Sequence, residues 1–274
     1  MNQEQLQELE RIARDVRRLT LQSIARLGIG HVGGAMSIAE VLTYLYFDHM
    51  HIDPEHPRMD DRDRLVLSKG HAGPVLYSIL AKKGFFRLDW LDTLNVGGTN
   101  LPSHCDRNLT PGIDMTTGSL GQGLSAALGI ALALRLDKRN SRVFAVIGDG
   151  ESQEGQNWEA AMSASHFKAG NLIAFTDNNH LQIDGSICEI MEIEVLEDKW
   201  RSFGWHTQKI NGHDFSQIEA AVHLAESVSE RPSMIILDTV KGKGCTFAEG
   251  QVASHNMPVS REQLDQALAA LEEN

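Results

Sequence analysis

The sequence predicts an α/β protein with a mostly parallel sheet and helices on both faces. Two observations support this prediction. Short apolar runs alternate with helical patterns along the chain, and residues 142–185 follow the order strand, tight turn, helix, strand, turn. Because such crossovers are right-handed, the two strands of this unit should lie parallel and close together. The 274 residues contain no repeat and no clear linker, so we expect one domain over residues 1–274.

The chain begins with the pattern of a long amphipathic helix. Its apolar positions are Leu6, Leu9, Ile12, Val16, Leu19 and Ile24, and its polar positions include Arg11, Arg14, Arg17 and Arg18. We expect these arginines to form a solvent-exposed face. A glycine-rich loop should follow at 28–34, where the lack of side-chain bulk lets a ligand approach the backbone. The next helix is expected at about 37–49.

The middle of the chain alternates strands with helices. We expect strands at 65–67, 143–147 and 172–175, and helices at 73–83, 87–94 and 152–167, with another that opens at 116–123 and reaches 136. The helix at 152–167 should carry Trp158, Ala161, Met162 and Ser165 on one face. Residues 96–115, around His104, form a long irregular connection. Such a segment in a compact domain is more often functional or interfacial than idle.

The same alternation continues to the end of the chain. We expect helices at 193–203, 214–228 and 261–272 and strands at 205–210 and 233–237. Asp214 ends a turn and is placed to cap the helix that follows it. Lys241 and Lys243 lie in a glycine-rich segment after the last strand, and the sequence alone assigns them no role.

Composition limits the possible partners and the compartment. The net charge of −12 argues against nonspecific nucleic-acid binding, because an extended basic surface is missing. Cys105, Cys188 and Cys245 match neither a disulfide framework nor a zinc pattern, which fits a reducing compartment. The first residues lack a signal-peptide pattern, and no apolar run approaches the ~20 residues of a membrane span. We therefore expect a soluble cytoplasmic protein that does not contact a membrane.

Two polar residues should meet at one edge of the sheet. Asp149 lies between two glycines after the strand at 143–147, and Asn179 ends the Asp-Asn-Asn run after the strand at 172–175. Open α/β sheets bind ligands at this edge. A carboxylate and a carboxamide offer hard oxygens, which suit Mg²⁺ completed by water and phosphate oxygens. The sequence therefore favours a diphosphate held through Mg²⁺, although both motifs also occur as ordinary turns after strands.

Gly-Asp-Gly followed thirty residues later by Asn-Asn resembles the thiamine diphosphate fingerprint, and the surrounding residues resemble transketolase. The resemblance covers Gly30 to about His255, as the amino-terminal third of a full-length transketolase. It implies a thiamine diphosphate-binding fold. It also implies metal ligation by Asp149, Asn179 and the Leu181 carbonyl, and cofactor contacts by His71, Gly118, Gly150, Asn179 and Ile183, the last against the thiazolium ring.

Four histidines gain a role only through this resemblance. Taken singly, His31, His71, His104 and His255 are more simply explained as surface or core residues. In transketolases the matching histidines contact the diphosphate and the sugar, so the resemblance implies catalytic roles for His31, His104 and His255. The sequence departs from the family pattern at Asn256, where the family usually has glycine after the histidine, and at Ser119, where it often has proline.

The resemblance also implies a missing partner. Glu154 and Glu159 match glutamates at the dimer interface of transketolases, although acidic residues early in a helix are also favoured by its dipole. The family activates thiamine diphosphate with a glutamate on a following pyrimidine-binding domain. We therefore expect that domain on a separate chain, the carboxyl-terminal transketolase subunit, and a heterotetramer of two chains of each kind.

The implied reaction is transfer of a two-carbon ketol unit from a ketose, expected to be phosphorylated, to an aldose. Two related enzymes share the fingerprint, namely the α subunit of a 2-oxoacid dehydrogenase and 1-deoxyxylulose-phosphate synthase. The four histidines and the segment 153–160 favour transketolase. A regulatory relative without catalysis is a third alternative, and the presence of Asp149, Asn179 and the histidines speaks against it.

Overall fold

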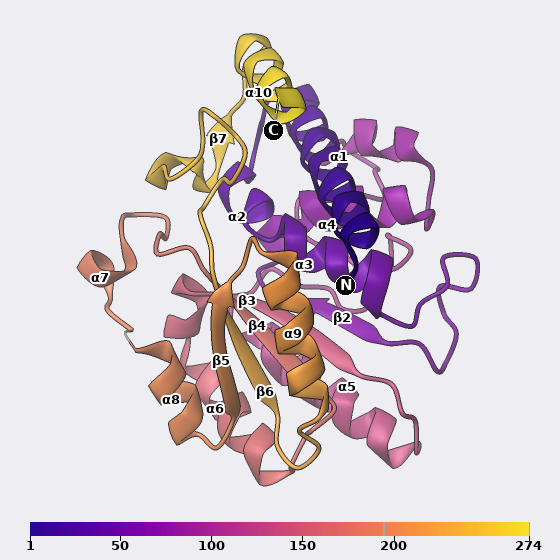
Figure 1. Ribbon diagram of the computed structural model, residues 1–274. Coiled ribbons are helices and arrows are strands. Elements are labelled where there is room, and N and C mark those ends of the chain that lie inside the picture. The colour runs from indigo at the N-terminus through magenta and orange to yellow at the C-terminus, as the bar shows by residue number, and fades with distance from the viewer. Residues whose placement is uncertain (194, 274) are drawn as a thin grey trace.

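A parallel sheet forms the centre of the protein in the computed structural model, which describes residues 1–193 and 195–273 (Figure 1). The five strands are β2 (Arg64–Leu67), β3 (Val143–Gly148), β4 (Leu172–Asn178), β5 (His206–Asn211) and β6 (Ser233–Asp238). They are all parallel and lie in the order β2-β3-β4-β6-β5. The predicted fold class is confirmed, and the two strands of the unit 142–185 are direct neighbours.

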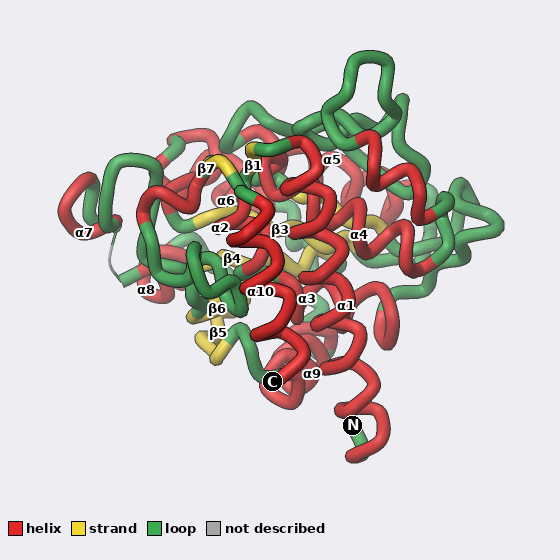
Figure 2. The backbone as a smooth tube through the Cα atoms, turned by 90° about the horizontal axis from the view of Figure 1, so that it is seen from above, coloured by secondary structure: helices red, strands yellow, loops and turns green. Residues whose placement is uncertain are grey.

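Helices cover both faces of this sheet. One face packs against α3 (Ala39–Tyr44) and α9 (Phe215–Glu226), with α1 (Gln3–Leu27), α4 (Gly73–Lys83) and α10 (Arg261–Glu273) beyond them. The other face packs against α5 (Gln122–Leu136), α6 (Gly155–His166) and α8 (Leu196–Ser202). Figure 2 shows α10 alongside α1. Alternation along β3 directs Phe144 and Val146 to the first core, and Ala145 and Ile147 to the second.

Helix α1 has the predicted amphipathic character, with one correction. Asn2 and Gln5 form a capping box at its start, and Gly28 ends it with a left-handed φ of 89°. Arg17, expected on the exposed face, is only 5% exposed. Its guanidinium forms an ion pair with Glu40 and donates to the Lys243 carbonyl at 2.9 Å. A charged side chain can be buried here because these partners satisfy it.

The predicted glycine-rich loop at 28–34 is instead a short strand and a helix. β1 (Ile29–Gly30) pairs antiparallel with β7 (Met257–Pro258), and α2 (Val32–Met36) follows. This pairing brings the chain around His31 close to the chain around His255. The connection at 96–115 contains neither helix nor strand, as expected.

Several predicted boundaries shift. The helix expected at 37–49 consists of α3 and a π-helix, Leu45–His49. The helix expected at 152–167 begins with a 3₁₀ turn, Gly150–Gln153, before α6. α6 buries Asn157, Ala160, Ala161 and Ala164, whereas Met162 is 55% exposed. The expected face of α6 is therefore wrong at Met162, because the buried positions follow the i, i+3, i+4, i+7 spacing that starts at Asn157, and Met162 lies outside that stripe.

The remaining elements are short. They include α7 (Ile187–Ile190), which projects from the body in Figure 1, and 3₁₀ turns at Gly70–Ala72, Leu88–Thr93 and Val252–His255. The helix expected at 193–203 is shorter: residues 193 and 195 are not helical, Val195 is extended, and α8 begins at Leu196, while residue 194 lies outside the described residues. Within the described ranges, no helix combines the length and apolar character needed to cross a membrane.

Candidate active site

The carboxyl edge of the sheet holds a cavity of about 200 Å³. Asp149 follows β3 directly and Asn179 follows β4 directly, so the register of these parallel neighbours brings both side chains to this cavity. The other residues that line it are Gly34, Lys69, His71, Leu120, Gly148, Gly150, Glu151, Asp177, Leu181, Gln182, Ile183, Asp184, Lys241 and His255.

Asp149 is a buried carboxylate held by backbone amides. It is 3% exposed, and it accepts hydrogen bonds from the Gly150 amide at 2.7 Å and the His180 amide at 2.6 Å. Burial, together with the nearby charge of Asp177, raises the pKa of Asp149 to about 7. A cation bound beside this carboxylate would favour its negative form, which is the behaviour expected of a metal ligand.

Asp177 orients the residues around it. It is completely buried in β4 and accepts hydrogen bonds from Lys69 Nζ and Ser37 Oγ, both at 2.6 Å, and from Thr239 Oγ1. Burial alone would raise the pKa of Asp177, but the Lys69 ammonium and these hydrogen bonds hold it below its ordinary value. Asp177 also accepts from Asn179 Nδ2 at 2.8 Å, and Asn179 Oδ1 accepts from the Leu181 amide at 3.2 Å, which leaves its second lone pair for a further partner.

Two lysines add positive charge to the cavity, and the sequence patterns indicated a role for neither of them. Lys69 lies between Asp177 and the Gly34 carbonyl, which accepts from Nζ at 2.7 Å. Lys241 is 2% exposed, and its Nζ donates only weakly to the carbonyls of Leu181 and Gln182, at 3.4 and 3.3 Å. Burial lowers the pKa of Lys241 to about 8. Because both carbonyl contacts are long, the buried Lys241 ammonium keeps N–H donors available for an anion.

The four predicted histidines come together beside this cavity. The ring of His31 lies 5.4 Å from that of His71, 5.6 Å from that of His104 and 5.4 Å from that of His255, measured between centroids. His71 and His255 are 4.9 Å apart and line the cavity, while His31 and His104 extend the cluster away from it. They come from four separate segments, so only the tertiary fold assembles them.

Burial makes these imidazoles weak bases. It lowers the pKa of His31 and of His255 to about 4, and that of His71 to about 2, with neighbouring cations or imidazoles adding to the effect. Burial also lowers the pKa of His104. All four rings are therefore neutral near pH 7, and each can donate one hydrogen bond and accept one.

The backbone beside the histidines needs glycine at Gly118. This residue has a φ of +145°, and a Cβ there would lie 3.1 Å from the His104 ring. Gly150 lies in the 3₁₀ turn after Asp149, and a Cβ would meet Gln182 at 3.2 Å. Ile183 lines the same cavity with 61% of its surface exposed, which is unusual for an isoleucine.

The glutamates after Asp149 have contrasting environments. Glu154 and Glu159 are both exposed on the outer side of α6, outside the cavity. Glu151 has no signal in the sequence that marks it, yet it is buried and accepts from Ser68 Oγ and from the amides of Gly121 and Gly148, at 2.9 and 3.0 Å. Glu151 therefore fastens the turn after β3 to the end of β2 and the start of α5.

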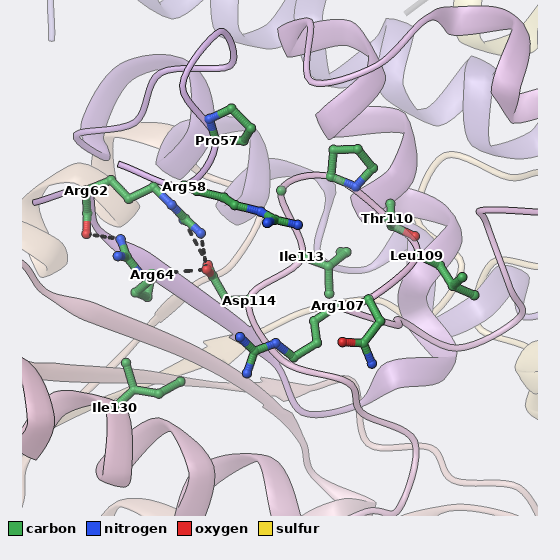
Figure 3. A pocket seen from close by; sticks show the side chains of 13 residues that line it. Pro57, Arg58, Arg62, Arg64, Arg107, Leu109, Thr110, Ile113, Asp114 and Ile130 are labelled. Carbon is green, nitrogen blue, oxygen red and sulfur yellow. Dashed lines mark hydrogen bonds and ion pairs between the residues drawn. The ribbon is translucent and has the colours of Figure 1, made fainter. Parts of the chain in front are cut away.

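A second hollow, of about 780 Å³, shares no lining residue with this cavity. Figure 3 shows its arginines, Arg58, Arg62, Arg64 and Arg107, around the single carboxylate of Asp114. Arg62 and Asp114 form a buried ion pair, with side chains 8% and 5% exposed. Because Arg64 begins β2, this hollow lies toward the amino edge of the sheet, away from the histidines.

The parallel sheet has buried charges at its carboxyl edge and clustered imidazoles beside them. Together these features define a ligand-binding α/β domain of the cofactor-dependent enzymes. Comparison with known families identifies the family within this class. Residues 9–272 match the family model described as the transketolase, thiamine diphosphate binding domain. The chain belongs to the transketolase family, which confirms the resemblance found in the sequence.

Individual relatives agree with this assignment. The chain is 56% identical to the 6-deoxy-6-sulfo-D-fructose transketolase subunit of a Clostridium species, over 99% of this chain and 98% of that protein. It is 37% identical to one subunit of the apulose-4-phosphate transketolase of Phocaeicola vulgatus, over 98% of this chain and 95% of that protein. The crystal structure of transketolase from Campylobacter jejuni superposes with a TM-score of 0.92 at 30% identity, covering 99% of this chain but only 43% of that one.

Proposed function

We propose that this chain is the diphosphate-binding subunit of a two-chain transketolase and folds as a single domain. One observation carries the proposal: four neutral histidine rings lie together beside a cavity that contains Asp149, Asn179 and two buried lysines. The similarity to relatives named as transketolase subunits, along nearly their whole length, supports it.

The oxygens at the cavity fit a Mg²⁺ ion. Asp149 supplies a carboxylate, Asn179 supplies Oδ1, and Leu181 supplies a backbone carbonyl that already faces the Lys241 ammonium. Such hard oxygens suit Mg²⁺, which completes its octahedron with water and phosphate oxygens. The raised pKa of Asp149 also favours this assignment, because a bound cation would stabilise the carboxylate.

The diphosphate would lie against donors around this ion. His71, Lys69 and Lys241 offer side-chain donors, and Gly150 lines the cavity without a side chain that would block phosphate oxygens. Gly118, which lies against the His104 ring, is proposed as a further contact to the cofactor. Ile183 would pack against the thiazolium ring, which accounts for its exposure beside the cavity.

Thiamine diphosphate, when bound, supplies a carbon nucleophile and an electron sink for the ketol unit. The chain supplies the groups that handle protons on the sugar. His31, His104 and His255 are neutral near pH 7, so each can donate a hydrogen bond to a sugar hydroxyl or carbonyl and accept a proton through its second nitrogen.

A partner chain would complete the site. Glu154 and Glu159 are proposed interface residues, and both are exposed. Exposed apolar side chains also occur on the segment after β4, namely Ile183, which lines the cavity, and Ile190, Met191 and Val195, and a partner chain would bury them. We propose that the partner is a carboxyl-terminal transketolase subunit and that the assembly is a heterotetramer. The three cysteines are unpaired, which supports a reducing, cytoplasmic location.

We propose a donor ketose with a terminal anion, either phosphate or sulfonate, and an aldose acceptor. The names of two relatives support both options, since one specifies a sulfo-sugar and the other a sugar phosphate. The test is a ketol-transfer assay on the purified two-chain complex with Mg²⁺ and thiamine diphosphate, using fructose 6-phosphate and 6-deoxy-6-sulfofructose as alternative donors. Transfer with either donor supports the proposal. A complex that binds the cofactor but transfers from neither would favour a non-catalytic relative.

A further inference from the structure

A second cluster of ligating side chains lies far from the cavity, on the outer side of the first core. His49 ends the π-helix, and His223 and Glu226 lie one turn apart on α9. In the described part of the chain, they are the one group of three or more His, Cys, Asp or Glu residues whose ligand atoms all lie within 4.8 Å of one another. We propose that these three residues bind a divalent first-row transition ion, specifically Zn²⁺.

The separations between the ligand atoms fit such an ion. His49 Nε2 lies 3.1 Å from Glu226 Oε1, and His223 Nδ1 lies 3.5 Å from Glu226 Oε2. Ligands about 2.0–2.1 Å from Zn²⁺ at tetrahedral angles lie about 3.3 Å from one another. Each histidine therefore lies near this distance from one oxygen of Glu226. The two contacts use different oxygens, so binding a single ion needs a side-chain adjustment, and the three ligand atoms already lie within 4.8 Å of one another.

The ring of His49 is held in the orientation that a ligand needs. Its Nδ1 lies 3.3 Å from the Tyr44 hydroxyl, and the two rings are stacked at 5.4 Å with an interplanar angle of 22°. The Phe144 ring contacts it edge-on at 5.7 Å. When Nδ1 carries the proton and donates to Tyr44, the lone pair of Nε2 faces Glu226. A polar partner at the second ring nitrogen that holds the ring in place is typical of histidines that bind metals.

Charges around the cluster decide how tightly it can bind. Arg142 Nε lies 3.1 Å from Glu226 Oε1 and competes with a cation for that oxygen. Glu226 Oε2, which faces His223, is left for the ion. Glu219 on the same helix is already paired with the terminal amine of Met1 at 2.8 Å. The guanidinium therefore weakens the site without blocking it.

Burial gives the site a closed side and an open side. The side chains of His49 and Glu226 are 10% and 20% exposed, whereas that of His223 is 59% exposed. Solvent can therefore supply the fourth ligand. Two imidazoles and one carboxylate suit Zn²⁺, whereas Mg²⁺ prefers oxygen ligands only. The ion would join the π-helix to α9, two elements that otherwise meet here through side chains.

The test is calorimetric titration of the purified, chelator-treated chain with ZnCl₂. Because the histidines beside the cavity could also take Zn²⁺, the relevant signal is the binding step that His223→Ala removes and His255→Ala retains. We expect His223→Ala and Glu226→Gln each to weaken this step at least tenfold. His166→Ala, which removes another exposed helical histidine, should leave it unchanged, and excess Mg²⁺ should not compete.

A second variant keeps the proposal falsifiable if those substitutions disturb folding. Arg142→Gln removes the competing cation and should tighten the same step, and the melting temperature with Zn²⁺ should rise more than in the wild type. Far-UV circular dichroism checks that each variant is folded. Identical Zn²⁺ isotherms for wild type and folded His223→Ala, or no effect of Arg142→Gln, would overturn the assignment.

Discussion

The two edges of the parallel sheet differ in how completely their buried charges are paired with opposite charges. At the amino edge, Arg62 is paired with Asp114, and Arg142 is paired with Glu226. At the carboxyl edge Lys69 is also paired with Asp177, but among the described residues the hydrogen-bond donors to Asp149 are backbone amides, and Lys241 makes two long carbonyl contacts. Charges that neutralise one another hold a fold together, whereas charges kept apart in a buried cavity are stabilised by a ligand of opposite sign. The comparison predicts that breaking the Arg62–Asp114 pair lowers stability, whereas removing the Asp149 carboxylate weakens cofactor binding.

The largest effect is expected from Asp149→Ala at the carboxyl edge. Removing the charged ligand should abolish measurable Mg²⁺-dependent binding of thiamine diphosphate, a loss of at least about 100-fold. Asn179→Ala, which removes a neutral oxygen, should weaken binding less. Calorimetric titration of the assembled complex measures both. Unchanged affinity in Asp149→Ala would show that this carboxylate is not the metal ligand.

At the amino edge, Arg62→Met should act on stability instead. It removes the closest ion-pair partner of the buried Asp114 carboxylate and leaves Arg64 Nε at 3.8 Å, so the free energy of unfolding should fall by about 2–4 kcal/mol. Urea unfolding measures this, and the cofactor affinity of the folded variant should not change. Arg139→Met is the matched control: its pair with Asp60 is exposed, with side chains 41% and 82% accessible, and should contribute less than about 1 kcal/mol.

At the carboxyl edge, some histidine substitutions should affect turnover and others should affect cofactor binding. His31→Ala and His104→Ala should each lower kcat by about 100-fold, because each removes a proton-transfer or hydrogen-bonding group near the substrate. Their cofactor affinity should stay near that of the wild type. His71→Ala should instead weaken cofactor binding, since His71 lines the cavity. Wild-type kinetics in all three variants would contradict the assigned roles.

The smallest expected effect is a change in the pH dependence of stability. The pKa of His31 is about 4 in the folded protein and about 6.5 for an unperturbed imidazole, so the unfolded state binds more protons between these values. Stability is therefore present above pH 6.5 and is lost as pH falls toward 4. His31→Gln should reduce the loss between pH 7 and pH 5 by about 1–2 kcal/mol in urea unfolding. An unchanged slope would mean that the His31 ring is solvated.

The sequence predicted those features that follow from local patterns. The order of strands and helices, the right-handed crossover and the approach of Asp149 to Asn179 need only periodicity and strand direction. The histidine cluster needed the family resemblance, because no spacing in the sequence relates His31 to His255. Arg17 was misplaced because its partner Glu40 lies on another helix. Lys69, Asp177 and Lys241 were not recognised as site residues, since their burial depends on neighbours that a linear pattern does not identify.

The two-residue pairing between β1 and β7 affects the order in which parts of the protein fold during synthesis. It pairs Ile29 with Pro258 and Gly30 with Met257, so it joins the first quarter of the chain to its last twenty residues. During synthesis His31 leaves the ribosome long before His255 exists. Closing a loop of more than two hundred residues also has an entropic cost of about 5 kcal/mol. The histidine cluster should therefore form only after all five strands of the parallel sheet have been synthesised, since the last of them, β6, ends at Asp238.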